Sequence, residues 1–79
     1  MITFEHVDEG ILEVFVDDEG KEILLSLLHN LKSPGDHEHL MTPAWSGHGL
    51  SEEANNPVGK VIQMVTIGMP KQKRTLPEE

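Results

Sequence analysis

The chain has 79 residues, no cysteine and a formal net charge of −8. This length fits one domain with a small core, and the lack of cysteine excludes disulfides and thiolate metal sites. No apolar run approaches the roughly 20 residues of a membrane span, and no basic segment followed by an apolar one opens the chain. We therefore expect a cytoplasmic protein without membrane partners.

Negative charge is concentrated near the N-terminus. Residues 1–22 contain eight acidic side chains and one base, Lys21, whereas Lys71, Lys73 and Arg74 lie in the last ten residues. A nucleic-acid binder needs Lys and Arg gathered on one face, so this distribution argues against nucleic acid as a partner. An acidic surface favours a basic protein partner and accelerates its capture, although acidity also keeps a small protein in solution.

Two segments with apolar side chains open the chain. Residues 2–7 alternate in polarity, residues 11–16 form a stronger apolar strand, and residues 8–10 are turn formers, which predicts a hairpin. One face of the second strand carries three aliphatic side chains: Leu12, Val14 and Val16. We expect this aliphatic face to be the buried one.

A helix is predicted after the hairpin. Asp17 and Asp18 suit its N-cap, and Glu19 lies in the first turn, where a carboxylate interacts well with free amides. Apolar residues then recur at helical spacing: Ile23, Leu24, Leu27, Leu28 and Leu31. Pro34 ends the helical pattern, and the apolar stripe should pack on a sheet.

Two further strands are predicted at residues 37–42 and 58–67, the second rich in β-branched side chains. The resulting order is ββαββ. It predicts an α+β two-layer sandwich, with one main helix packed on a largely antiparallel four-stranded sheet. Residues 1–69 form this single domain, and residues 70–79, which have no apolar period, are predicted to be a flexible C-terminal tail.

Residues 36–49 hold three of the five histidines and the only tryptophan, so recognition or chemistry is expected there. Strand alternation places His37 and His39 on one face and Glu38 on the other, and His48 follows in a Gly-rich loop. Three imidazoles are the ligand count of an open zinc site. The pattern is a frequent one, so the three histidines are weak metal candidates, surface histidines are the simpler interpretation, and no cofactor is expected.

Catalysis finds little support in the sequence. Acid–base chemistry by Glu38 with a histidine needs a desolvated pocket that shifts a pKa, and a sheet with a single helix layer has little depth for one. The chain has no phosphate-binding glycine loop, no cysteine nucleophile and no serine in a nucleophile elbow. We therefore expect a protein that is not an enzyme and has no catalytic residues.

Trp45 has two interpretations. It is either a core anchor that closes the open end of the sandwich or a partly exposed hot spot for a protein partner. Pro43, Gly47 and Gly49 would hold its loop away from the sheet, which favours recognition. The candidate partner-binding residues come from this stretch and from the acidic start of the helix: Trp45, His37, Glu38, His39, His48, Asp17, Asp18 and Glu19.

Two runs of residues, with Leu50-Ser51-Glu52 after the second, carry a family resemblance. They are Val14-Phe15-Val16-Asp17-Asp18-Glu19-Gly20, before the Leu-rich helix, and Asp36-His37-Glu38-His39-Leu40-Met41-Thr42-Pro43-Ala44-Trp45-Ser46-Gly47. This pattern resembles the immunity protein 32 family of bacterial polymorphic toxin systems, over residues 11–68. The resemblance implies a small α+β cytoplasmic protein that neutralises a cognate toxin by direct contact and has no catalytic residues.

The leading hypothesis is therefore a small acidic immunity protein that occludes a cognate toxin, for example a nuclease with a basic cleft. One alternative is a His-based metal-binding protein or small enzyme. Another is a homodimeric structural or interaction module that associates through a sheet edge or the Phe15 face. Both a monomer and a homodimer fit the sequence.

Overall fold

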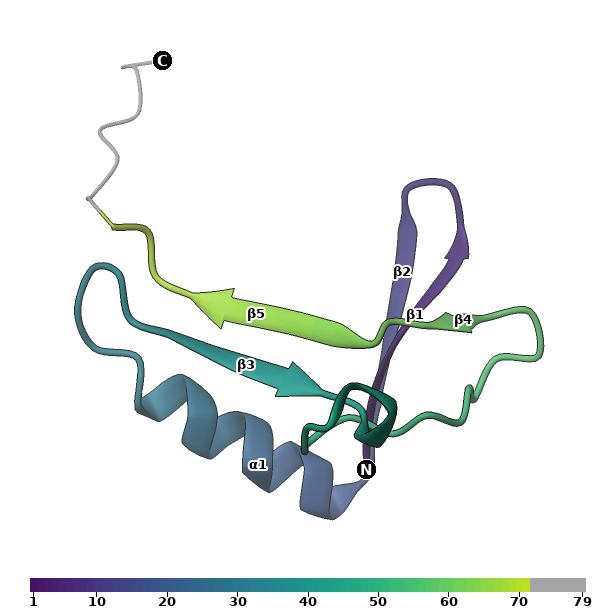
Figure 1. The fold of residues 1–79 in the computed structure, drawn as a ribbon, viewed down its shortest axis with the longest axis horizontal. Helices are drawn as coiled ribbons and strands as arrows, with labels where there is room; N and C mark the ends of the chain where they lie inside the picture. The colour runs from purple at the N-terminus through teal and green to yellow at the C-terminus, as the bar shows by residue number, and fades with distance from the viewer. Residues whose placement is uncertain (72–79) are drawn as a thin grey trace.

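The computed structural model describes residues 1–71, and residues 72–79, which hold most of the predicted tail, lie outside the described residues. The elements follow one another as β1 (Ile2–Asp8), β2 (Ile11–Val16), α1 (Asp18–His29), β3 (His37–Met41), the 3-10 turn η1 (Pro43–Trp45), β4 (Lys60–Val61) and β5 (Met64–Gly68) (Figure 1). The α+β class is as predicted. No helix in the described range is long and apolar enough to cross a membrane.

The described strands form two antiparallel sheets, ordered β2-β1-β4 and β3-β5, where the sequence predicted one four-stranded sheet. The difference arises in residues 58–67, predicted as one strand. The Ile62 N–H donates to the Phe4 carbonyl at 2.7 Å, whereas the next residue, Gln63, accepts the Thr42 N–H at 3.0 Å. The chain therefore leaves β1 and joins the sheet of β3 between two consecutive residues.

The N-terminal hairpin forms as predicted, but its aliphatic face is not buried. Leu12 is 53% exposed and Val14 47% exposed. Figure 1 shows the tip of the hairpin projecting away from α1, so the helix covers only the end near Ile2. The opposite face of the hairpin is the better buried one, because residues 55–56 lie over Glu5 there. The predicted orientation of β2 is therefore wrong.

Helix α1 begins where the sequence predicts. The Asp17 carboxylate accepts the Gly20 N–H at 2.8 Å and also binds the amino group of Met1. Gly20 lies against the Met1 carbonyl, where an added Cβ would stand 2.1 Å from the oxygen, so a side chain is excluded at this contact. The buried stripe is narrower than predicted, because Ile23 and Leu28 on its flanks are exposed.

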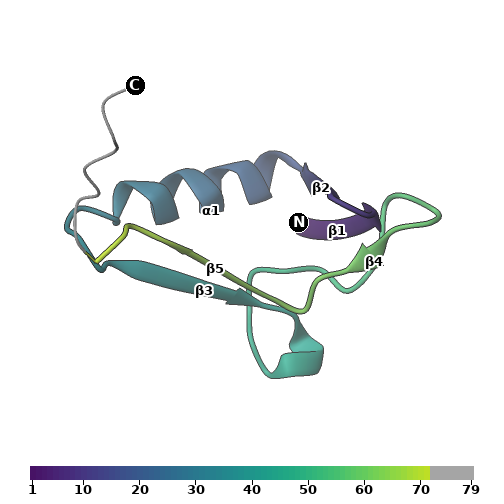
Figure 2. The same cartoon turned by 90° about the horizontal axis from the view of Figure 1, so that it is seen from above.

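The core lies between α1 and one face of the β3-β5 sheet (Figure 2). It consists of four buried residues, Ile2, Leu27, Leu40 and Leu50, with Phe4, Leu24, Leu31, Val65 and Ile67 partly buried against them. The strand register pairs Leu40 with Val65 on the inner face. Because α1 covers only this side, the other face of β3-β5 is left open to solvent.

Candidate functional site

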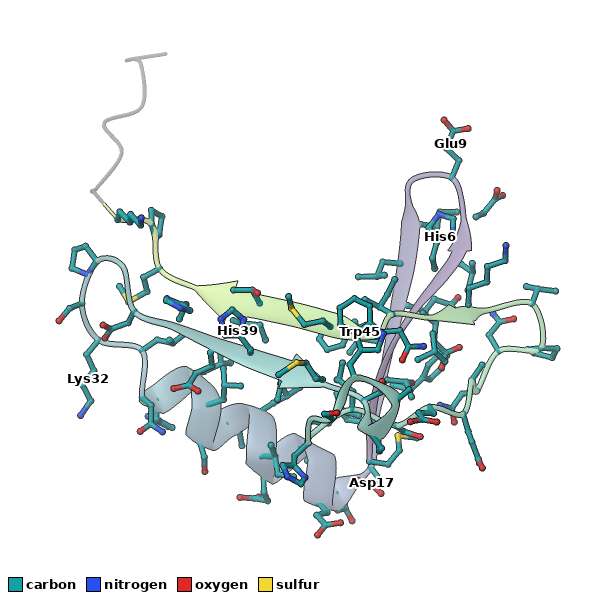
Figure 3. The ribbon with its side chains drawn as sticks, in the orientation of Figure 1. His6, Glu9, Asp17, Lys32, His39 and Trp45 are labelled. Atoms are coloured by element: carbon teal, nitrogen blue, oxygen red, sulfur yellow. The ribbon has the colours of Figure 1, made fainter. Side chains whose placement is uncertain are left out.

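The open face of the β3-β5 sheet carries three of the eight residues that the sequence predicted for partner binding: His37, His39 and Trp45. The register pairs His37 with Gly68, His39 with Thr66 and Met41 with Met64, and residues paired in this way share a face. Turn η1 lies on the side of the sheet opposite α1, and Trp45 lies near the Met64 end (Figures 2 and 3). We call this surface the outer face and define it by His37, His39, Met41, Met64, Thr66 and Trp45.

Trp45 is an exposed side chain and not a core anchor. Its exposed fraction is 57%. The fully buried Thr42 holds the turn beneath it, since the Thr42 carbonyl accepts the N–H groups of Trp45 at 2.9 Å and Gly47 at 3.1 Å. The Thr42 hydroxyl donates to the side-chain oxygen of Gln63, which ties the turn to the start of β5.

Two further contacts and one backbone conformation define the loop that carries the indole. The Ala44 N–H donates to the Glu52 carboxylate. Ser46 adopts a left-handed conformation with φ of 61°. Gly47 packs so closely on Met41 that an added Cβ would stand 2.3 Å from the Met41 Cβ. The outer face therefore presents Trp45 from a loop whose geometry is set before any partner binds.

His37 and His39 form a pair on the outer face. Their ring centroids are 5.0 Å apart, with the rings edge to face at 68°. His37 donates from Nδ1 to the Gly35 carbonyl at 3.0 Å, and Nδ1 of His39 lies 2.8 Å from the Thr66 hydroxyl oxygen. His48 is exposed elsewhere, and residues 1–71 contain no group of three or more His, Asp or Glu that could hold a metal ion. The predicted three-histidine arrangement is therefore not formed.

The remaining predicted residues do not join the outer face. Glu38 alternates with the histidines, pairs with Ile67 on the other face of the sheet and is exposed. Asp17, Asp18 and Glu19 start α1, on the opposite side of the sheet from η1 (Figure 2). The bond from the terminal amino group, and then the Gly20 N–H, lower the pKa of Asp17. The acids and the indole therefore belong to two separate surfaces.

Glu5 is a site that the sequence analysis missed, because it counted this residue among the surface acids. The side chain is fully buried. Its carboxylate accepts the Thr3 hydroxyl at 2.7 Å and the N–H groups of Asn55 at 2.8 Å and Asn56 at 3.0 Å. Burial alone would raise the pKa of Glu5, but the backbone donors and then the side-chain donors outweigh it and lower the pKa to about 2.

Both carboxylate oxygens of Glu5 accept hydrogen bonds from other residues of the chain. The carboxylate therefore has a structural role and is not available for catalysis. It ties residues 55–56 to β1. The one sequence signal was Thr3, two positions before Glu5 and therefore on the same strand face. The donors that complete the site lie 50 and 51 positions later in the chain, beyond the reach of any local pattern.

The described residues show no pocket, and the outer face is an open surface. Comparison of the chain with family models, with curated proteins and with solved structures gives no match. The resemblance to the immunity protein 32 family therefore stays a prediction, and function has to be argued from the outer face and from the charge.

Proposed function

We propose that this protein is a small acidic immunity protein that binds a cognate bacterial toxin in the cytoplasm and neutralises it by direct occlusion. The observation that carries the proposal is the exposure of Trp45 on a fixed loop. Tryptophan is the side chain most enriched among residues that dominate binding energy at protein interfaces. An indole held in place before binding also loses little conformational freedom when a partner covers it.

The composition of the outer face supports the same reading. Met41 and the exposed Met64 lie opposite each other on β3 and β5, on the face that also carries Trp45. Methionine side chains adapt to the shape of a partner. His37 and His39 continue the surface along β3 with polar groups, so the outer face has an apolar end and a polar end. Protein interfaces likewise combine apolar and polar contacts.

The negative net charge of the chain indicates which kind of partner it would bind. The net charge of −8 favours a basic protein, such as a nuclease toxin with a basic cleft. Asp18 and Glu19 are exposed at the start of α1, away from Trp45. These acids would therefore attract the toxin from a distance, while the outer face makes the contact that blocks its cleft.

The test is co-expression with the toxin-like product encoded beside this gene, scored by rescue of growth and by recovery of a one-to-one complex. Trp45→Ala should weaken binding by about 2 kcal/mol or more. Val58→Ala is the matched control, since Val58 is 70% exposed and lies outside the outer face. Equal affinity of a folded Trp45→Ala variant and of Val58→Ala would remove the outer face from the proposal, and a toxin that is neither bound nor neutralised would overturn it.

A further inference from the structure

We infer that His37 and His39 form a two-histidine binding site for a borderline divalent transition metal such as Ni²⁺, Cu²⁺ or Zn²⁺. This site does not rest on the proposed toxin binding. The two side chains lie on the same face of β3, and both are exposed, so an ion from solvent can reach them. His48 is not part of the site.

The hydrogen bonds assign the ring proton of His37 and allow the same tautomer in His39. The Gly35 carbonyl can only accept, so the Nδ1 atom of His37 carries the hydrogen of that 3.0 Å bond. The Thr66 hydroxyl donates its own hydrogen to Met64 Sδ at 3.5 Å. In the tautomer that matches this donation, the hydroxyl oxygen accepts from Nδ1 of His39 at 2.8 Å. With both neutral rings in this tautomer, both Nε2 atoms have a free lone pair, and neutral imidazole nitrogen is the commonest metal ligand in proteins.

These same bonds supply the outer support that metal-binding histidines usually have. A histidine ligand normally donates from its second nitrogen to a carbonyl, carboxylate or other oxygen, which fixes the tautomer and the ring orientation. The Gly35 carbonyl supplies this acceptor for His37, and the Thr66 hydroxyl supplies it for His39. The pair therefore offers two Nε2 atoms as metal ligands, and each ring has a hydrogen-bond partner that orients it.

The separation of the two ring centroids equals that of two imidazoles bound to one ion. With metal–nitrogen distances of about 2.0–2.1 Å and a tetrahedral angle, two imidazoles bound to one metal have centroids about 5 Å apart. The observed centroid separation is 5.0 Å. Imidazole nitrogen prefers nickel, copper and zinc to magnesium. Two protein ligands leave the other coordination positions to water, so the site should be selective in metal type but of modest affinity.

The experiment is calorimetric titration of the untagged full-length chain with Ni²⁺, repeated with Zn²⁺ and with Mg²⁺. We expect one ion per chain for Ni²⁺ and Zn²⁺ and no binding of Mg²⁺. His37→Gln and His39→Gln should each lower the affinity by about tenfold or more, and Thr66→Val should also weaken it by about tenfold, because it removes the acceptor that orients His39. His29→Gln is the control and should keep the wild-type affinity, since His29 lies at the end of α1.

A readout on the unaltered protein makes the test independent of how the variants fold. Ni²⁺ is paramagnetic, so it should broaden the ring resonances of His37 and His39 before those of the other three histidines in NMR spectra. No Ni²⁺ binding, broadening centred on His6, His29 or His48, or wild-type affinity in a His37→Gln/His39→Gln double variant would each overturn the site. Toxin binding measured with a chelator present is a separate readout, so either proposal can fail alone.

Discussion

The carboxylate of Glu5 in β1 accepts the backbone N–H of Asn55 at 2.8 Å, although the two residues are 50 positions apart. The Asn56 N–H and the Thr3 hydroxyl complete the site, and Asn56 also donates from its side chain to Glu13 at 2.9 Å. A buried charge is tolerated only where hydrogen bonds replace its lost hydration. This one group thus fastens the segment before β4 to the hairpin.

Stability should depend on pH because of Glu5. Its pKa is about 2 in the folded protein against an ordinary value of 4.5. The unfolded chain therefore binds more protons between these values, so the stabilisation is complete above about pH 4.5 and is lost as the pH falls to 2. Urea unfolding at intervals from pH 2 to 7 should show this slope, as a free energy of unfolding that falls with falling pH below about pH 4.5. Asp17 and Asp36, whose pKa values are also lowered, should add to it with the same sign.

Glu5→Gln should lower the melting temperature and flatten that slope. The glutamine amide would place an NH₂ group among backbone donors that need an acceptor, so at least one N–H would lose its partner. Glu9→Gln is the matched control, since Glu9 is exposed in the hairpin turn. Thermal melts at pH 7 and pH 3 compare the variants, and an equal pH dependence in Glu5→Gln and wild type would contradict the role of Glu5.

Two leucine truncations should separate the buried and exposed sides of the fold. Leu40→Ala should lower the free energy of unfolding by about 2–5 kcal/mol, because Leu40 is 6% exposed in the core. Leu12→Ala removes the same atoms from the exposed face of β2 and should cost about 0.5 kcal/mol or less. Urea denaturation measures both. A large loss in Leu12→Ala would mean that this face, which lies opposite the Phe15 face, is covered in solution, and sedimentation would then show whether a second copy of the chain covers it.

Gly47→Ala should destabilise the loop beneath Trp45. The added methyl group would stand 2.3 Å from the Met41 Cβ, so the loop or β3 must shift. Overpacking of this kind costs about 1–3 kcal/mol, and the shift should also change the fluorescence of the only tryptophan. Ser46→Ala in the same loop is the control and should leave the emission unchanged, because Ser46 is exposed.

In toxin binding, the acidic side chains at the start of α1 should affect the association rate constant, and the indole of Trp45 should affect the dissociation rate constant. Asp18→Asn with Glu19→Gln should slow association at low salt and leave dissociation unchanged, because these exposed acids act at a distance. The difference should fade at high ionic strength as charges are screened. Trp45→Ala should mainly speed dissociation. Surface plasmon resonance at two salt concentrations resolves both effects, and a salt-independent association rate would argue against steering by the acids.

Local patterns predicted much of the fold. Turn residues located the hairpin, Asp17 located the start of α1, and alternation placed His37 and His39 on the face opposite Leu40. The outer face could be predicted to this extent, because alternation is a property of the strand alone. The exposure of Trp45 could not be decided, since a core anchor and an exposed anchor have the same local sequence.

Features that depend on distant partners were missed. Residues 58–67 are apolar on both faces, and only the contacts with Phe4 and Thr42 decide where the strand changes sheets. The buried face of β2 depends on the segment that covers it, and Glu5 depends on Asn55. In each case the deciding atoms come from another part of the chain, so no period within the segment could reveal them.

The direct passage from one sheet to the other at Ile62 and Gln63 also fixes the number of residues between β4 and β5. Ile62 is bonded to β1, and Gln63 is bonded to Thr42 beside β3, so no spare residue separates the two sheets. One inserted residue before Met64 would shift β5 by one position and turn Val65 and Ile67 toward solvent and Met64 and Thr66 toward α1. The buried and the exposed side chains of β5 would be exchanged. Chain length at this point is therefore as strict a requirement as any side chain.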